Sequence, residues 1–218
     1  MNIISPKSIN KKNQIISFII IVFCLIFIKI ISGTNYYKND TLIIDSDMTL
    51  NQAIANSSIP GALINGLDIV DVNYYSFDSK LHKGQVVIRK ELANDIKGIF
   101  MEIKDSHFPI GKVVPIIKYN WSDIASMEDN NSSAFNYRTV KSTRLISSHA
   151  QGVAIDINPL LNPQIKHGRV SPPGIVYDPS KPGTLTANCV VVKAFIKKGW
   201  QWGGHWQTTK DYQHFEKK

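Results

Sequence analysis

The feature that most constrains this chain is a long apolar run near its start. Residues 15–31 (IISFIIIVFCLIFIKII) are interrupted only by Ser17 and Lys29, so a helix over them has no polar face to lie on a domain surface. Such a helix would be about 25 Å long, slightly shorter than the ~30 Å hydrocarbon layer of a bilayer. Three lysines and no acid precede the run. We therefore predict an N-terminal hydrophobic helix within residues 1–33.

Two fates of this leader fit the sequence. The basic start, the apolar centre and Ser32-Gly33 match a signal peptide cleaved after Gly33. The same residues match a retained membrane anchor, in which Lys29 extends its ammonium group to the polar interface. We favour the anchor. With either fate, the lysines on the inner side predict that the rest of the chain is exported to the cell envelope.

The charge and the cysteines exclude several classes of protein. The chain has a net charge of +8, but four of these charges are lysines of the leader, which leaves +4 for the exported part. No basic cluster with interleaved aromatic residues occurs there, which argues against a nucleic-acid partner. Two cysteines are too few for a disulfide framework or a zinc-thiolate site.

Residue patterns divide the exported part in two. Residues 34–64 are rich in Asn, Ser, Asp and Thr, which predicts a linker with one short helix near 50–55. Residues 65–218 show both strand and helix patterns without a regular βαβ order. We therefore predict an α+β domain over 65–218, with a central antiparallel sheet. The expected strands lie near 70–74, 85–88, 113–117, 154–157 and 212–216, the expected helices span 90–103 and 190–198, and the proline-rich stretch 158–187 is expected to be irregular.

Histidines and acids gather at two places in this domain. His149 and Asp156 are seven residues apart around Gly152, where a hairpin would turn both side chains toward one point. Asp211 and His214 are three residues apart near the end of the chain. Two histidines and one carboxylate form a known set of catalytic zinc ligands that leaves a fourth position for water.

Each of these residues also has an ordinary structural explanation. His149 would be a loop histidine bonded to the backbone, Asp156 a turn residue, and His214 an exposed residue of an edge strand. The spacing alone does not decide between these explanations and a metal site.

Three ordered motifs carry a resemblance to a known family. SSHAQGVAIDINP, residues 147–159, resembles the S-x-H-x-x-G-x-A-x-D signature of the VanY-like D-alanyl-D-alanine carboxypeptidases and the related L-alanyl-D-glutamate endopeptidases. WGGHWQTTKDYQHFEK, residues 202–217, is similar to their second signature, W-G-G-x-W followed by D-x-x-H-F. SAFNYR, residues 133–138, is similar to their arginine-bearing segment. The resemblance covers roughly residues 65–218 and implies a Hedgehog/D-Ala-D-Ala peptidase-like fold.

The resemblance implies a role for each matching residue. His149, Asp156 and His214 would bind Zn²⁺, and Asp211 would be the general base. Arg138 would hold a developing oxyanion or a carboxylate of the substrate, for which its planar guanidinium suits.

Two further residues are expected to bind substrate. Ser147 would lie beside the ligands or against the substrate. His205 departs from the family pattern, which more often has Asp at this place, and we expect it to line the pocket.

Strand geometry sets a condition on the base. If residues 212–216 form a strand, His214 lies on the opposite face from Asp211. Asp211 then reaches the metal site only if the chain bends before Tyr212.

The resemblance implies zinc-dependent hydrolysis of a peptide bond in the stem peptides of peptidoglycan. We favour an L-Ala–D-Glu endopeptidase, because of the Asp211-to-His214 spacing and the segment at Arg138. A D-alanyl-D-alanine carboxypeptidase is the first alternative, and a D-Ala-D-Ala dipeptidase is a more distant one. A non-catalytic cell-wall-binding module on the same fold is the alternative from another class, although a binding module has no need of Asp211.

Overall fold

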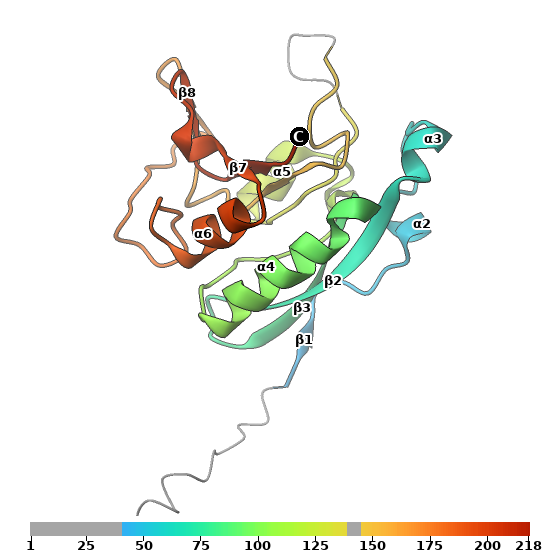
Figure 1. Ribbon diagram of the computed structural model, residues 1–218, viewed down its shortest axis with the longest axis horizontal. Helices are drawn as coiled ribbons and strands as arrows, with labels where there is room; N and C mark the ends of the chain where they lie inside the picture. The colour runs from blue at the N-terminus through green and yellow to red at the C-terminus, as the bar shows by residue number, and fades with distance from the viewer. Residues whose placement is uncertain (1–40, 139–144) are drawn as a thin grey trace, which may run out of the picture. The chain divides into compact units, whose positions relative to one another are not determined.

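The computed structural model describes residues 41–138 and 145–218. The predicted leader, residues 1–33, lies outside these residues. Within them, no helix combines the length and the apolar character needed to cross a membrane. The chain from Thr41 to Lys218 forms one unit, whose elements follow the colour gradient of Figure 1.

A long hairpin forms the first sheet. Its strands β2 (Leu67–Tyr75) and β3 (Leu81–Arg89) are antiparallel and paired over their whole length, and β1 (Ile43–Ile44) runs parallel to β3. Alternate residues of β2 are buried, as the sequence predicts. Residues 84–88 of β3 are buried in succession, because apolar side chains cover both faces of this part of the strand.

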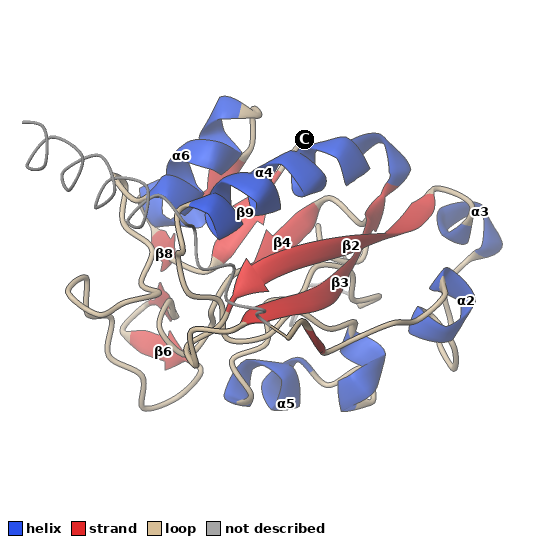
Figure 2. Cartoon of the chain, turned by 90° about the horizontal axis from the view of Figure 1, so that it is seen from below, coloured by secondary structure: helices blue, strands red, loops and turns tan. Residues whose placement is uncertain are grey.

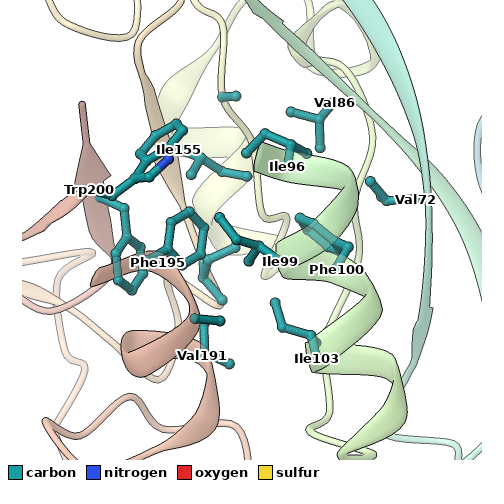
Figure 3. Close-up of a cluster of buried hydrophobic side chains, with 14 of the residues drawn as sticks. Val72, Val86, Ile96, Ile99, Phe100, Ile103, Ile155, Val191, Phe195 and Trp200 are labelled. Carbon is teal, nitrogen blue, oxygen red and sulfur yellow. The ribbon is translucent and has the colours of Figure 1, made fainter. Parts of the chain in front are cut away.

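Helices lie on both sides of this hairpin, with α4 and α6 on one side and α5 on the other (Figure 2). Their bounds are α4 (Ala93–Asp105), entered through the 3-10 turn η1 (Lys90–Leu92), α5 (Asp123–Glu128) and α6 (Val190–Lys197). Ile96, Ile99 and Ile103 recur on α4 at intervals of three and four, so they share one apolar face. This face meets Phe195 of α6 in the main core (Figure 3).

Two further sheets consist of strands of only two or three residues. One has the order β4-β9-β7 and the other β6-β5-β8, and neighbouring strands are antiparallel in both. The strands are β4 (Ala154–Asp156), β5 (Gln164–Lys166), β6 (Arg169–Ser171), β7 (Gln201–Trp202), β8 (Thr209–Asp211) and β9 (His214–Glu216). Since β8 and β9 belong to different sheets, the chain bends at residues 212–213.

The structure confirms a small domain of mixed strands and helices with antiparallel sheets. It differs from the prediction of one central sheet, because the described residues form three separate three-stranded sheets. The irregular stretch 158–187 contains β5 and β6, which pair with each other and, through β5, with β8. These strands are too short for their alternation to stand out in the sequence.

The segment for which the sequence predicts a linker contributes to the folded unit from Thr41 onward. It contains β1, α2 (Leu50–Ala53), close to the expected short helix, and α3 (Gly61–Ile64). Ala53 and Ile59 are buried in a second apolar cluster with Val87 and Phe135. A few apolar residues in a polar background are enough to fold this segment, because they pack on the face of the hairpin that carries Val87, opposite to the face covered by α4.

The strand expected at 113–117 is absent from the described structure. Its end forms the 3-10 turn η2 (Ile116–Tyr119). The side chain of Asn131 replaces a neighbouring strand: its amide donates to the carbonyl of Val114 over 3.0 Å, and its oxygen accepts from the N–H of Val114 over 2.9 Å. The apolar run is therefore buried without belonging to a sheet ladder.

Candidate metal centre

His149 lies in a tight turn between residues 147 and 152. The hydroxyl of Ser147 accepts a hydrogen bond from the N–H of His149 over 3.3 Å, and Gly152 closes the turn with a φ of +71°. The imidazole is buried, and its Nδ1 lies 2.6 Å from the carbonyl oxygen of Ala134. Because a carbonyl only accepts, Nδ1 carries the proton and Nε2 keeps its lone pair.

Asp156 and His214 face each other across the β4–β9 pair. Nδ1 of His214 lies 3.0 Å from Oδ1 of Asp156 and 3.1 Å from Nε2 of His149. Nε2 of His149 lies 3.3 Å from the same carboxylate oxygen. Two strand partners and one turn residue thus bring three ligand atoms to a common point, as the sequence predicts.

Electrostatic interactions within the site shift the pKa values of Asp156 and His214. Burial would raise the pKa of Asp156, but the two histidines outweigh it and the pKa is lowered. Burial would lower the pKa of His214, but hydrogen bonds from its nitrogens to Asp156 and Glu216 raise it to about 10. Two imidazole nitrogens and one carboxylate oxygen match the donor set of a catalytic zinc site, so these residues could hold a metal ion.

Asp211 lies beside this set at the end of β8. Its Oδ2 accepts a hydrogen bond from Nε2 of Gln164 over 2.5 Å, whereas its buried Oδ1 has no hydrogen-bond partner in the described structure. Burial and the charge of Asp156 raise the pKa of Asp211 to about 6. A buried acceptor without a partner next to three ligand atoms fits a site that takes a metal ion and a water molecule.

The chain bends between Asp211 and His214, at residues 212–213, slightly later than the predicted bend before Tyr212. β8 ends at Asp211 and β9 begins at His214, in another sheet. The carbonyl of Gln213 accepts from the N–H of Ile157 over 3.0 Å. Gly203, in the 3-10 turn η3 (Gly203–His205), makes room for the end of β8, because a Cβ there would lie 2.5 Å from the carbonyl oxygen of Asp211.

Arg138 lies near the turn of His149 through its backbone, since its carbonyl accepts from the N–H of Ser147 over 3.2 Å. Its guanidinium contacts the carboxylate of Asp123 in α5. Asp123 also accepts a hydrogen bond from the side-chain amide of Asn136 over 2.5 Å. The structure therefore brings Arg138 to the border of the site with its charge already paired.

The remaining candidates have different surroundings. His205 is exposed, and its ring lies edge-on to Trp202 at 5.0 Å. The ring of Trp206, by contrast, lies 5.4 Å from that of His214. Ser147 is buried, and its hydroxyl serves the turn of His149.

The sequence patterns gave no prediction for two polar residues at the site. Glu216 lies 3.4 Å from Nε2 of His214 through its Oε2, and this contact lowers the pKa of Glu216 to about 2. The alternation of a strand places residues 214 and 216 on one face, which is a signal that could have revealed Glu216. Gln164 had no such signal, because its contact with Asp211 depends on the pairing of β5 with β8.

The comparison with known families agrees with this geometry. Residues 140–217 match the family model described as D-alanyl-D-alanine carboxypeptidase, and they include the three ligand residues and Asp211 but not Arg138. No curated protein and no solved structure matches the chain. Over residues 140–217, which hold two of the three motifs, the match confirms the resemblance to the VanY-like zinc peptidases. It indicates a metallopeptidase of the D-alanyl-D-alanine carboxypeptidase type.

Proposed function

We propose that this protein hydrolyses a peptide bond in the stem peptides of peptidoglycan with the help of Zn²⁺. The proposal depends on one observation above all: Nε2 of His149, Oδ1 of Asp156 and Nδ1 of His214 lie 3.0–3.3 Å apart. Asp211 adds a buried carboxylate with one unpaired oxygen. A module that only binds the cell wall would need neither feature.

The proposed roles follow from the chemistry of each group. His149, Asp156 and His214 would hold the zinc ion, which, when bound, polarises a carbonyl and makes water a better nucleophile near neutral pH. Oδ1 of Asp211 takes a proton from the attacking water and later gives it to the nitrogen of the leaving amine. Burial raises the pKa of Asp211 above the usual range of an aspartate, which suits it to take up a proton and give it back.

The proposed bond is that between L-Ala and D-Glu. A carboxypeptidase needs a cation for the terminal carboxylate of its substrate, and the guanidinium of Arg138 is already in contact with Asp123. This pairing favours an endopeptidase. The description of the matching family favours the second candidate, a D-alanyl-D-alanine carboxypeptidase. In that case Arg138 would exchange Asp123 for the substrate carboxylate.

The remaining parts of the proposal concern the surroundings of this chemistry. Ser147 orients the turn that carries His149, and His205 contacts substrate at the exposed rim. The fold is proposed to be of the Hedgehog/D-Ala-D-Ala peptidase type, with its peptidase domain over residues 65–218. Export behind the leader places the domain in the cell envelope, where peptidoglycan is the available substrate.

Digestion of purified peptidoglycan tests the proposal. The full-length protein, Asp211→Asn and the matched control Asp178→Asn, a partly exposed acid in the loop before α6, are assayed for zinc content and for fragments by mass spectrometry. New amino termini at D-Glu, formed by the wild type and the control only, support the endopeptidase. Free D-Ala instead supports the carboxypeptidase. Full zinc loading without cleavage supports a binding module.

A further inference from the structure

We propose that Glu216 is a positioning residue for the metal ligand His214: its carboxylate holds Nε2–H of the imidazole and thereby makes Nδ1 the nitrogen that faces the metal. This inference deepens the proposed function and rests on it. It concerns a residue that acts through His214 and does not itself contact the metal or the substrate.

The geometry around His214 defines which nitrogen is which. Nε2 lies 3.4 Å from Oε2 of Glu216, while Nδ1 lies 3.0 Å from Oδ1 of Asp156 and 3.1 Å from Nε2 of His149. Asp156 and Glu216 can only accept, so in the metal-free site each nitrogen of His214 faces an acceptor. A cation shared with Nε2 of His149 and Oδ1 of Asp156 would take the lone pair of Nδ1. The single N–H of the neutral imidazole would then lie on Nε2, where Glu216 accepts it.

The burial of Glu216 indicates that its contact with His214 is the reason why a charged residue stands at position 216. Glu216 is 9% exposed, and a buried carboxylate is costly unless it is paired. Its other partner, Lys218, lies 3.2 Å away but has a side chain that is 75% exposed, so this ion pair contributes little. The neighbours of Glu216 across the sheet, Ala154 and Gln201, carry no charge. His214 is the buried partner that remains.

The two histidines of the site are oriented by different acceptors. His149 donates from Nδ1 to the backbone carbonyl of Ala134 over 2.6 Å and presents Nε2. His214 donates from Nε2 to a carboxylate and presents Nδ1. A carboxylate acceptor fixes the ring and also strengthens the imidazole as a ligand, and loss of such a partner typically weakens metal affinity about 10–100-fold.

Zinc affinity provides the test, measured by competition with a chromogenic chelator on the full-length protein. We expect Glu216→Leu to bind Zn²⁺ about 10–100-fold more weakly than the wild type. Glu216→Gln keeps an acceptor oxygen, so its Zn²⁺ affinity should stay close to that of the wild type. If Glu216→Leu weakened binding only through lost packing, an acceptor oxygen at this position would make no difference. The matched control Lys218→Ala removes the other partner of Glu216 and should leave the affinity unchanged. Equal affinity of Glu216→Leu and wild type would overturn the inference.

A second measurement does not depend on any variant folding. In the zinc-loaded wild type with ¹⁵N-labelled histidine, the ring signals of His214 should show a protonated Nε2 and a metal-bound Nδ1, and those of His149 the reverse. A metal-bound Nε2 in His214 would overturn the inference while leaving the metal centre intact. A wild type that binds no zinc would overturn the proposed function and this inference together.

Discussion

The region around α4 and the region around β9 bury their side chains for different reasons. Between the hairpin, α4 and α6, the cluster of buried residues is aliphatic and aromatic, and the elements that carry it are eight to thirteen residues long. Around β4, β8 and β9, strands of three residues bury Asp211, Gln213, His214 and Glu216. Burial of apolar surface stabilises a fold at about 25 cal/mol per Å², whereas burial of polar groups costs free energy unless they are paired.

The unpaired groups sharpen this contrast. Oδ1 of Asp211, at the end of β8, and Oε1 of Gln213, in the connection to β9, are both buried without a hydrogen-bond partner in the described structure. The first region therefore supplies stability. The second lowers it, because it keeps polar groups out of bulk water without partners. Each of the following predictions separates these two roles.

The largest expected effect is on activity. Asp211→Asn should reduce peptide hydrolysis by about 10²–10⁴-fold, the usual contribution of a positioned general base. The same variant should unfold at higher urea concentration at pH 8 when metal is chelated. The wild-type carboxyl, with its pKa raised from 3.8 to about 6, costs about 1–3 kcal/mol when ionised in the fold. A loss of activity accompanied by a loss of stability would contradict the assignment of Asp211 as a base.

A substitution in the core should lower the stability of the protein. Phe195 is fully buried and stacks on Phe215 with ring centroids 3.9 Å apart, so Phe195→Ala should destabilise the protein by about 3–5 kcal/mol in urea denaturation. Met101→Ala is the matched control on α4, because this side chain is 62% exposed, and it should change stability by less than about 0.5 kcal/mol. A Phe195→Ala variant of unchanged stability would mean that the region around α4 does not supply most of the free energy of folding.

The pH dependence of hydrolysis should report on Asp211. The base works only when deprotonated, so kcat/KM should fall as the pH drops through about 6, and at lower pH if a bound cation stabilises the carboxylate. The hydrogen bond from Gln164 lowers the pKa of Asp211, so Gln164→Leu should move this limb to higher pH. Gln164→Glu should move it further, because a second carboxylate disfavours ionisation. A limb that stays in place in both variants would exclude Gln164 from this role.

The smallest effect concerns the segment before the hairpin. Thr49 caps α2: its hydroxyl accepts from the N–H of Gln52, whose side chain accepts from the N–H of Thr49 over 2.7 Å. Thr49→Ala should cost about 1 kcal/mol in chemical denaturation, whereas the exposed control Asn51→Ala should cost much less. If residues 41–64 were only a linker, neither substitution would change the stability of the unit.

The elements that the sequence predicts well are those with a long repeat of apolar residues. β2, β3, α4 and α6 each have enough residues for a period of two or of 3.6 to show. β5, β6 and β8 have three residues each and exist because they pair with one another, which no local pattern reveals. The run at 113–117 has the pattern of a strand, but it bonds to the side chain of Asn131 and to the backbone N–H of Gln85 without joining a ladder.

The same distinction applies to the site. The grouping of His149, Asp156 and His214 was predictable because the motifs state it. A bend near Tyr212 followed from the face that His214 must take, although the structure places it at residues 212–213. Gln164 depends on a strand pairing and could not be found in this way. The partner of Arg138, Asp123, was also not predictable, because it belongs to α5, a short helix for which the sequence shows no clear pattern.

The pairing of Asp156 with His214 in one sheet has a consequence for the metal-free chain. An ion held by these two residues would cross-link β4 and β9 and so close the long loop between them, which contains β5 and β8. An ion that binds only the folded site stabilises the fold. Chelation should therefore make opening of the segment between β4 and β9 more frequent, and protease cleavage there should become faster.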